Sequence, residues 1–163
     1  MELSALIVVL LILSFIFPFL FMNGNKKIEQ QLKNELENLA THWNSEVGTT
    51  ELMSNTIIAL SKPGNRLFVV KQRDKNWIKT QITLSEMKQC NVRTSRRTVT
   101  QKTTITEVID RIELAFSPKG NNRPEIIIEF YDSDFDSYSI SSELQIAQKW
   151  QKIAAESIEK LSI

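Results

Sequence analysis

Residues 107–131, EVIDRIELAFSPKGNNRPEIIIEFY, decide the fold that we expect for this chain. In RIELAF apolar side chains alternate with charged ones, and in EIIIEFY the first and third isoleucines and the phenylalanine share one face. A period of two is typical of a half-buried β-strand. Between these parts, SPKGNNRP combines the residues that favour turns. The segment therefore predicts two strands, 107–116 and 125–131, joined by a turn.

The residues before this segment predict further short strands separated by turns. In KPGN, Pro63 presets φ and Gly64 tolerates a positive φ, so residues 62–65 are expected to form a turn. Residues 74–76 predict another turn, and the threonine-rich stretch 98–106 predicts an exposed hairpin. The strand-like runs are residues 56–60, 66–71, 77–83 and 89–93.

The chain ends in a predicted amphipathic helix. Ser142 and Gln145 have the spacing of a capping box, in which each side chain satisfies a free N–H group of the first helical turn. Such a helix has to bury its apolar face, and the sheet is the largest available partner. The apolar residues at helical spacing are Leu144, Ala147, Trp150, Ala154, Ile158 and Leu161.

Three segments together resemble small bacterial pleckstrin-homology-like (PH-like) domains: DRIELAF at 110–116, EIIIEFY at 125–131 and AQKWQKI at 147–153. In such domains a late pair of strands precedes a helix with an Ala-x-x-Trp-like core motif. The resemblance covers about residues 52–162. It implies two bent antiparallel sheets that form an open barrel, with the helix closing one end. A generic α+β sandwich is the alternative.

At the other end of the chain, residues 3–22 read LSALIVVLLILSFIFPFLFM and contain no charged residue. A helix of this length spans roughly 30 Å, the thickness of a bilayer's hydrocarbon core. We interpret residues 1–23 as an uncleaved transmembrane anchor, because the run lacks a basic start and a small-residue cleavage site. A signal peptide and a type IV pilin stem are the alternatives, and the Gly-Phe processing site of pilins is absent from the sequence.

The charges beside the apolar run predict its orientation. Lys26, Lys27 and Lys33 follow it, whereas no Lys or Arg precedes it. The positive-inside rule then places the C-terminal domain in the cytoplasm. A single cysteine, Cys90, agrees with a reducing compartment, because it has no partner for an internal disulfide.

Residues 24–48 predict a juxtamembrane amphipathic helix with one apolar stripe. We expect this helix to pack on the domain that follows. A homodimeric coiled coil and a helix lying in the membrane interface are the alternatives. The stripe consists of Ile28, Leu32, Leu36, Leu39, Trp43 and Val47, and Gly48 provides a stop.

The expected fold class is therefore α+β, with three parts along the chain. Residues 1–23 form a transmembrane helix, and residues 24–48 form the juxtamembrane helix. Residues 52–163 form a PH-like small antiparallel β-barrel or sandwich of six or seven strands with a C-terminal capping helix. After residue 22 the chain carries all 20 Lys and Arg residues and all but one of the 19 Asp and Glu residues. This near balance argues against a nucleic-acid-binding protein.

Four basic residues in the threonine-rich hairpin form a candidate site for lipid headgroups or a protein partner. Anionic lipids attract such residues at about 1 kcal/mol per charge near the membrane surface. The alternative is an exposed hairpin whose charges only keep it soluble. The candidate residues are Arg93, Arg96, Arg97 and Lys102.

A second candidate site is the acidic run after the last predicted strand. Asp132, Asp134, Asp136 and Glu143 stand at relative positions 1, 3, 5 and 12, the ligand spacing of an EF-hand calcium loop. The glycine expected at position 6 is replaced by Ser137, and a strand precedes the run instead of a helix. We therefore favour a solvated acidic loop and expect no metal or cofactor.

The sequence contains no catalytic motif that we recognise, and its single histidine, His42, has no partner nearby in the sequence. We expect a non-enzymatic, single-pass membrane-anchored binding or scaffolding module, presented at the cytoplasmic membrane surface to a protein partner or lipid headgroups. The alternative is an outward-facing structural subunit of an envelope or secretion assembly, which would oligomerise through residues 26–47.

Overall fold

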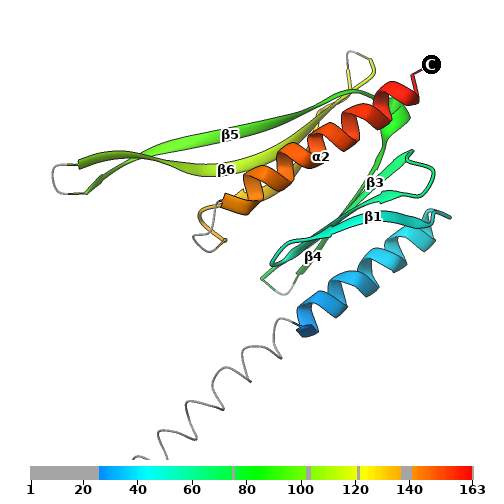
Figure 1. The fold of residues 1–163 in the computed structure, drawn as a ribbon, viewed down its shortest axis with the longest axis horizontal. Coiled ribbons are helices and arrows are strands. Elements are labelled where there is room, and N and C mark those ends of the chain that lie inside the picture. The colour runs from blue at the N-terminus through cyan, green and yellow to red at the C-terminus, as the bar shows by residue number, and fades with distance from the viewer. Residues whose placement is uncertain (1–25, 75, 102–103, 121, 137–140, 163) are drawn as a thin grey trace, which may run out of the picture.

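The structure is a computed structural model that describes residues 26–74, 76–101, 104–120, 122–136 and 141–162. Seven antiparallel strands form two sheets, and one helix precedes the strands while another follows them (Figure 1). The first sheet has the order β1-β2-β3-β4 and the second has the order β5-β6-β7. A short 3₁₀ turn, Leu84–Glu86, links the two sheets.

Helices and strands do not alternate along the chain: a first helix is followed by four strands of one sheet, three strands of the other and a final helix. The first helix is described over residues 26–42. The strands and the second helix are β1 (Val47–Leu52), β2 (Thr56–Ser61), β3 (Arg66–Arg73), β4 (Asn76–Thr83), β5 (Met87–Gln101), β6 (Thr104–Pro118), β7 (Ile126–Asp132) and α2 (Ser141–Lys160).

The four-stranded sheet is covered on both faces, because each of its two central strands has four consecutive apolar residues, 57–60 in β2 and 67–70 in β3. In β2, Ile58 faces the core shared with the second sheet, whereas Ile57 faces the N-terminal helix. In β3, Val69 and Val70 divide in the same way. Full burial of such side chains stabilises the fold by about 1.5–3 kcal/mol each. Figure 1 shows the sheet between α2 on one side and the N-terminal helix on the other.

The N-terminal helix packs on the four-stranded sheet, as its apolar stripe predicts. Leu32, Leu36 and Ala40 are buried there against β2 and β3. The helix is shorter than the predicted stripe, because Asn44 adopts a positive φ of 47° and Val47 already belongs to β1. The predicted stop at Gly48 is wrong. This glycine lies inside β1, where a Cβ atom would sit 2.9 Å from the carbonyl oxygen of Leu60.

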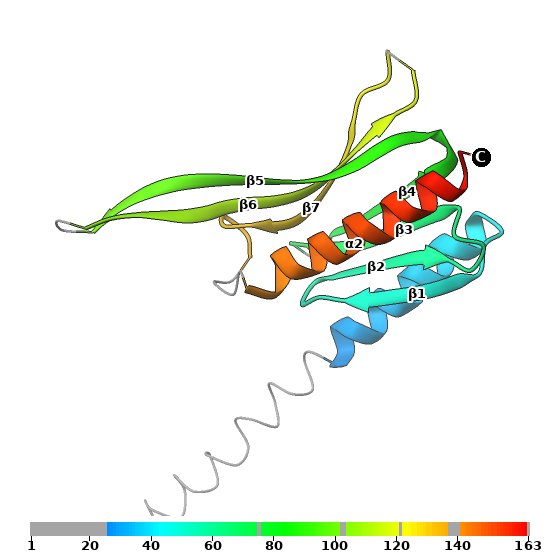
Figure 2. The same ribbon diagram turned by 45° about the horizontal axis from the view of Figure 1, so that its top comes forward.

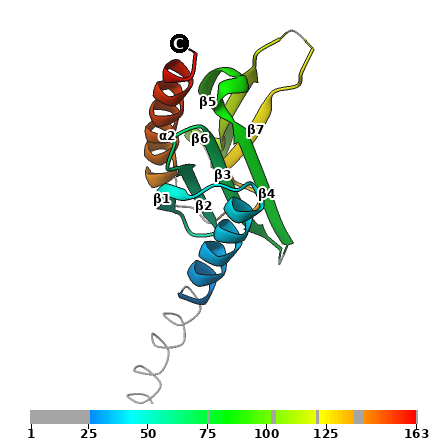
Figure 3. The same ribbon diagram turned by 90° about the vertical axis from the view of Figure 1, so that its right-hand side faces the viewer.

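Helix α2 closes the main core between the two sheets. Trp150 is fully buried, and its indole N–H donates to the Glu51 carboxylate of β1 at 2.9 Å. Ala147 and Ala154 lie one turn to either side and let the helix approach the strands closely. In Figure 3 α2 runs along one side of the molecule, whereas β4 and β7 lie toward the other.

Strands β5 and β6 form the longest hairpin, with 15 residues each. Strand β7 pairs with β6 only between Arg111 and Phe116. The outer half of the hairpin is therefore a two-stranded ribbon that projects beyond the rest of the domain (Figure 2). The predicted exposed hairpin at 98–106 is its outer end.

The predicted fold class is wrong. It required an N-terminal transmembrane helix, and no helix in the part of the chain that the structure describes is long and apolar enough to cross a membrane. The predicted membrane segment, residues 3–22, lies outside the described residues. The strands form one sheet of four and one of three, followed by a C-terminal helix, and the PH-like barrel stays a prediction.

Candidate binding site between the sheets

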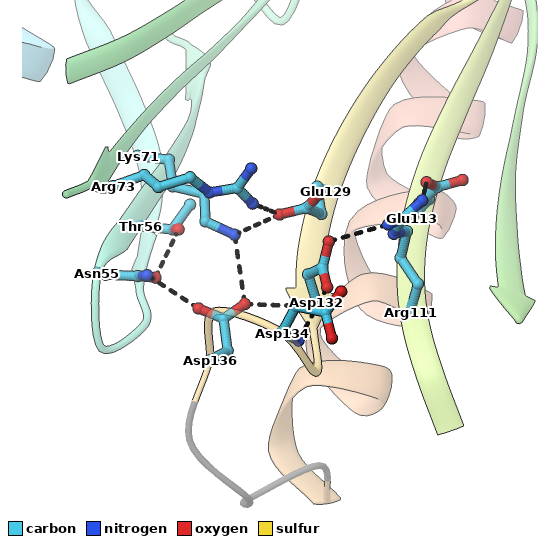
Figure 4. Close-up of polar contacts among 10 residues, drawn as sticks. All are labelled: Asn55, Thr56, Lys71, Arg73, Arg111, Glu113, Glu129, Asp132, Asp134 and Asp136. Carbon is cyan, nitrogen blue, oxygen red and sulfur yellow. Dashed lines mark hydrogen bonds and ion pairs between the residues drawn. The ribbon is translucent and has the colours of Figure 1, made fainter. Parts of the chain in front are cut away.

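A cluster of paired charges lies between the end of β3 and the end of β7 (Figure 4). The Lys71 ammonium of β3 donates to Glu129 Oε1 of β7 at 2.9 Å, and lies 3.4 Å from Asp136 Oδ2. The Arg73 guanidinium donates through Nη2 to the same Oε1 of Glu129. These contacts join the two sheets where they share no backbone hydrogen bonds.

Lys71 is the most deeply buried charge of the cluster, with a side chain only 6% exposed. Burial lowers its pKa, and the neighbouring Asp136 carboxylate opposes this shift. Asp136 in turn accepts a hydrogen bond from the Asn55 amide at 3.0 Å and another from the Asp132 backbone N–H at 2.9 Å. The carboxylate of Asp136 thus holds the loop after β7 against the β1–β2 turn.

Asp132, the last residue of β7, faces the other way, toward Arg111 of β6. Burial alone would raise its pKa, but the Asp134 backbone N–H and the Arg111 guanidinium, each 3.0 Å away, outweigh burial and lower it. The carboxylates of Asp132 and Asp136 thus have separate hydrogen-bond partners. The described residues contain no group of three or more acidic, His or Cys side chains that fits a metal ion. The EF-hand spacing therefore finds no support in this loop.

A groove of about 160 Å³ opens beside the charged cluster. Its walls come from β3, β4 and β7, and Lys71, Arg73 and Glu129 lie among its lining residues. Ile78 of β4 and Ile127 of β7 also line it, although they are 44% and 49% exposed. The outer edges of β4 and β7 pair with no other strand among the described residues. The groove therefore combines exposed apolar side chains with two free strand edges.

Arg73 connects this groove to a third exposed apolar residue. The ring of Phe135, which is 57% exposed, lies 4.3 Å from the guanidinium carbon. This cation–π contact covers one face of the guanidinium. Within the described residues, Glu129 is the only hydrogen-bond acceptor of Arg73, and the buried Nε of Arg73 has no partner. The guanidinium thus keeps unused donors next to an apolar groove.

The predicted basic cluster is not continuous in the structure. Arg93 and Arg97 lie on one face of β5, whereas Arg96 lies on the other. Each is exposed and pairs with an acidic residue, and Lys102 lies outside the described residues. The pairs are Arg93–Glu125 at 2.7 Å, Arg96–Glu107 at 3.7 Å and Arg97–Asp110 at 3.2 Å.

The single histidine and the single cysteine lie apart from this groove. His42 is exposed at the end of the N-terminal helix and makes an edge contact with Trp43, with ring centres 5.9 Å apart. Cys90 is buried in the main core, and burial raises the pKa of its thiol to about 12. A thiol with this pKa is a weak nucleophile at neutral pH.

The charged cluster was missed in the sequence, although a signal for it exists. In RLFVVKQR, Lys71 and Arg73 follow Leu67 and Val69 at alternate positions, on the strand face that packs into the main core. Comparisons with protein-family models, with curated protein sequences and with solved structures find no match to this chain. The resemblance to PH-like domains therefore stays a prediction.

Proposed function

We propose that this protein is a non-enzymatic, single-pass membrane-anchored module that binds a protein partner in the groove between β4 and β7. One observation carries the proposal: two exposed apolar side chains, Ile78 and Ile127, line this groove between two free strand edges, and the exposed ring of Phe135 stacks on Arg73 beside it. Ile78, Ile127 and Phe135 are each about half exposed. Exposed apolar residues that adjoin one another are typical of interaction sites, whereas isolated ones are not.

The energetics of this groove suit a moderate, reversible interaction. Covering the exposed parts of the two isoleucines would contribute about 2 kcal/mol in total. Hydrogen bonds to a free strand edge add further stabilisation, as in β-augmentation, where an extended peptide joins a sheet. Anchoring by residues 3–22 would raise the effective concentration of the module near membrane partners, so that weak intrinsic affinity suffices.

The structure gives less support to the other expected binding modes. The basic residues of β5 are neutralised by acidic partners, which weakens the attraction to anionic lipids. The apolar stripe of the N-terminal helix is occupied by the sheet, so an outward-facing subunit that oligomerises through residues 26–47 would need another contact surface. Among the expected functions, we therefore prefer a protein partner at the groove, on the cytoplasmic side of the membrane.

Site-specific photo-crosslinking in native membranes tests this proposal. A benzophenone amino acid replaces Ile127 or Ile78 in the full chain, and replaces the exposed Thr94 of β5 as a matched control. We expect one discrete cross-linked band from both groove positions, reduced when the other groove isoleucine is changed to Asp. No adduct at either groove position, or the same adducts from Thr94, would refute the proposed site. Extraction at alkaline pH tests the anchor, since an integral protein stays with the membrane.

A further inference from the structure

We propose that the partner presents an extended segment with alternating β-branched apolar side chains and one carboxylate, which binds Arg73. This inference rests on the proposed function, because it specifies the chemistry of the partner for the same groove. Three features of the groove carry it: the sharing of one acceptor by two cations, the position of the Arg73 guanidinium, and the shape of the strand edges.

The groove has one acidic lining residue for two basic ones. Lys71 and Arg73 both donate to the same oxygen, Oε1 of Glu129. Lys71 has a second partner in Asp136, but Arg73 has none among the described residues. Asp136 serves Lys71 from outside the groove lining and has no hydrogen bond with Arg73 among the described residues, so the shortage remains at Arg73. A carboxylate from outside would supply the missing acceptor at Arg73.

The Arg73 side chain is already held in place for such a contact. Phe135 stacks on its guanidinium, and Glu129 fixes one of its nitrogen atoms. An arginine held in this way loses little side-chain freedom when it binds a carboxylate. Bonds between a guanidinium and a carboxylate are also among the stronger hydrogen bonds in proteins. The interaction at Arg73 therefore adds specificity to the apolar contacts.

The strand edges determine the shape of the ligand. β4 has eight residues and β7 has seven, and both present a free edge at the groove. An extended segment of similar length has the same two-residue repeat of side chains as these strands, because successive side chains of any strand point to opposite faces. Its β-branched residues would contact Ile78 and Ile127, and a proline in its centre would remove a backbone donor.

The test uses the full chain in lipid nanodiscs and fluorescent peptides of eight residues. The probe peptide is TVTETVTV, with capped ends, in which the valines and the glutamate share one face, and its two controls are TVTQTVTV and TVTEPVTV. Binding is followed by fluorescence anisotropy. We expect the glutamate peptide to bind about tenfold more tightly than the glutamine peptide. The proline peptide is expected to bind more weakly than both.

Variants of the protein separate the role of Arg73 from general folding. Arg73→Met is expected to remove the preference for glutamate over glutamine, whereas Arg73→Lys retains part of it. Arg96→Met, which removes a charge on the distant ribbon, is expected to leave the preference unchanged. Circular dichroism spectra verify that each variant is folded.

Three outcomes would overturn the inference. Equal binding of the glutamate and glutamine peptides, or a preference that persists in folded Arg73→Met, would exclude the carboxylate at Arg73. Failure of every peptide to bind would exclude the extended segment. If photo-crosslinks at Ile127 and Ile78 still form in that case, the proposed function stands with a partner of different shape. If they are absent as well, both proposals fail.

Discussion

Replacement of Asp136 by Ala provides a sharp test of how the two sheets are joined. Asp136 accepts hydrogen bonds from Asn55 and from the Asp132 backbone, and it lies beside the buried Lys71 ammonium. Each hydrogen bond contributes about 1 kcal/mol, and a buried cation that loses a partner adds a further penalty. Lys71 still keeps Glu129, so we expect the free energy of unfolding to fall by about 3 kcal/mol.

Thermal unfolding of the full chain in mild detergent, followed by circular dichroism, measures this loss. We expect the midpoint to fall by about 10 °C. Asp134→Ala is the matched control, because Asp134 lies in the same loop and is exposed, and its carboxylate makes no hydrogen bond or ion pair with the described residues. This control is expected to change the free energy of unfolding by less than about 0.5 kcal/mol. Equal effects of the two substitutions would refute the account of the charged cluster.

Three further predictions concern acid stability, thiol reactivity and the N-terminal helix. Because the pKa of Asp132 is lowered in the folded state, the unfolded chain binds a proton first as the pH falls below its ordinary value of 3.8. The ionised Asp132 therefore stabilises the folded chain above that pH, and this stabilisation is lost as the pH falls toward the pKa of the folded state. In Asp132→Asn the thermal midpoint should therefore fall less between pH 5 and pH 3 than it does in the unchanged protein. Cys90, with a thiol pKa of about 12, should react with maleimide at pH 8 about 1000-fold more slowly in the folded than in the denatured chain; labelling at similar rates would contradict its burial. Leu36→Ala should lower the free energy of unfolding by about 3 kcal/mol, whereas the exposed neighbour Glu37→Ala should leave it nearly unchanged; equal midpoints would show that the helix does not pack on the sheet.

Local structure was largely predictable because it follows from the period of apolar residues. The predicted strand at 56–60 corresponds to β2, and the predicted strand at 125–131 corresponds to β7 within one residue at each end. The stripe of the N-terminal helix predicted the face that packs on the sheet. The length of β5 was not predictable in this way, because residues 94–101 are polar except for Val99 and lack a period of apolar residues.

The arrangement of the sheets and the site depended on contacts that are distant in the sequence. Lys71 and Glu129 are separated by 58 residues, and no local pattern shows that they pair. The acidic run from Asp132 was expected to be a solvated loop, but Asp132 is buried, and the side chains of Asp132 and Asp136 diverge toward Arg111 and Lys71. Charges that cluster in the sequence, such as those of β5, are instead divided between the two faces of a strand.

The central claim is that the groove between β4 and β7 is covered by a partner in the native membrane. The rate of maleimide labelling at introduced cysteines tests it most directly, since the buried native thiol of Cys90 gives little background. Ile78→Cys, Ile127→Cys and the control Thr94→Cys are each labelled in native membranes and after purification. We predict that the two groove cysteines react several-fold more slowly in native membranes, whereas the control reacts equally in both. If each of the three cysteines reacts at the same rate in native membranes as after purification, the claim is contradicted.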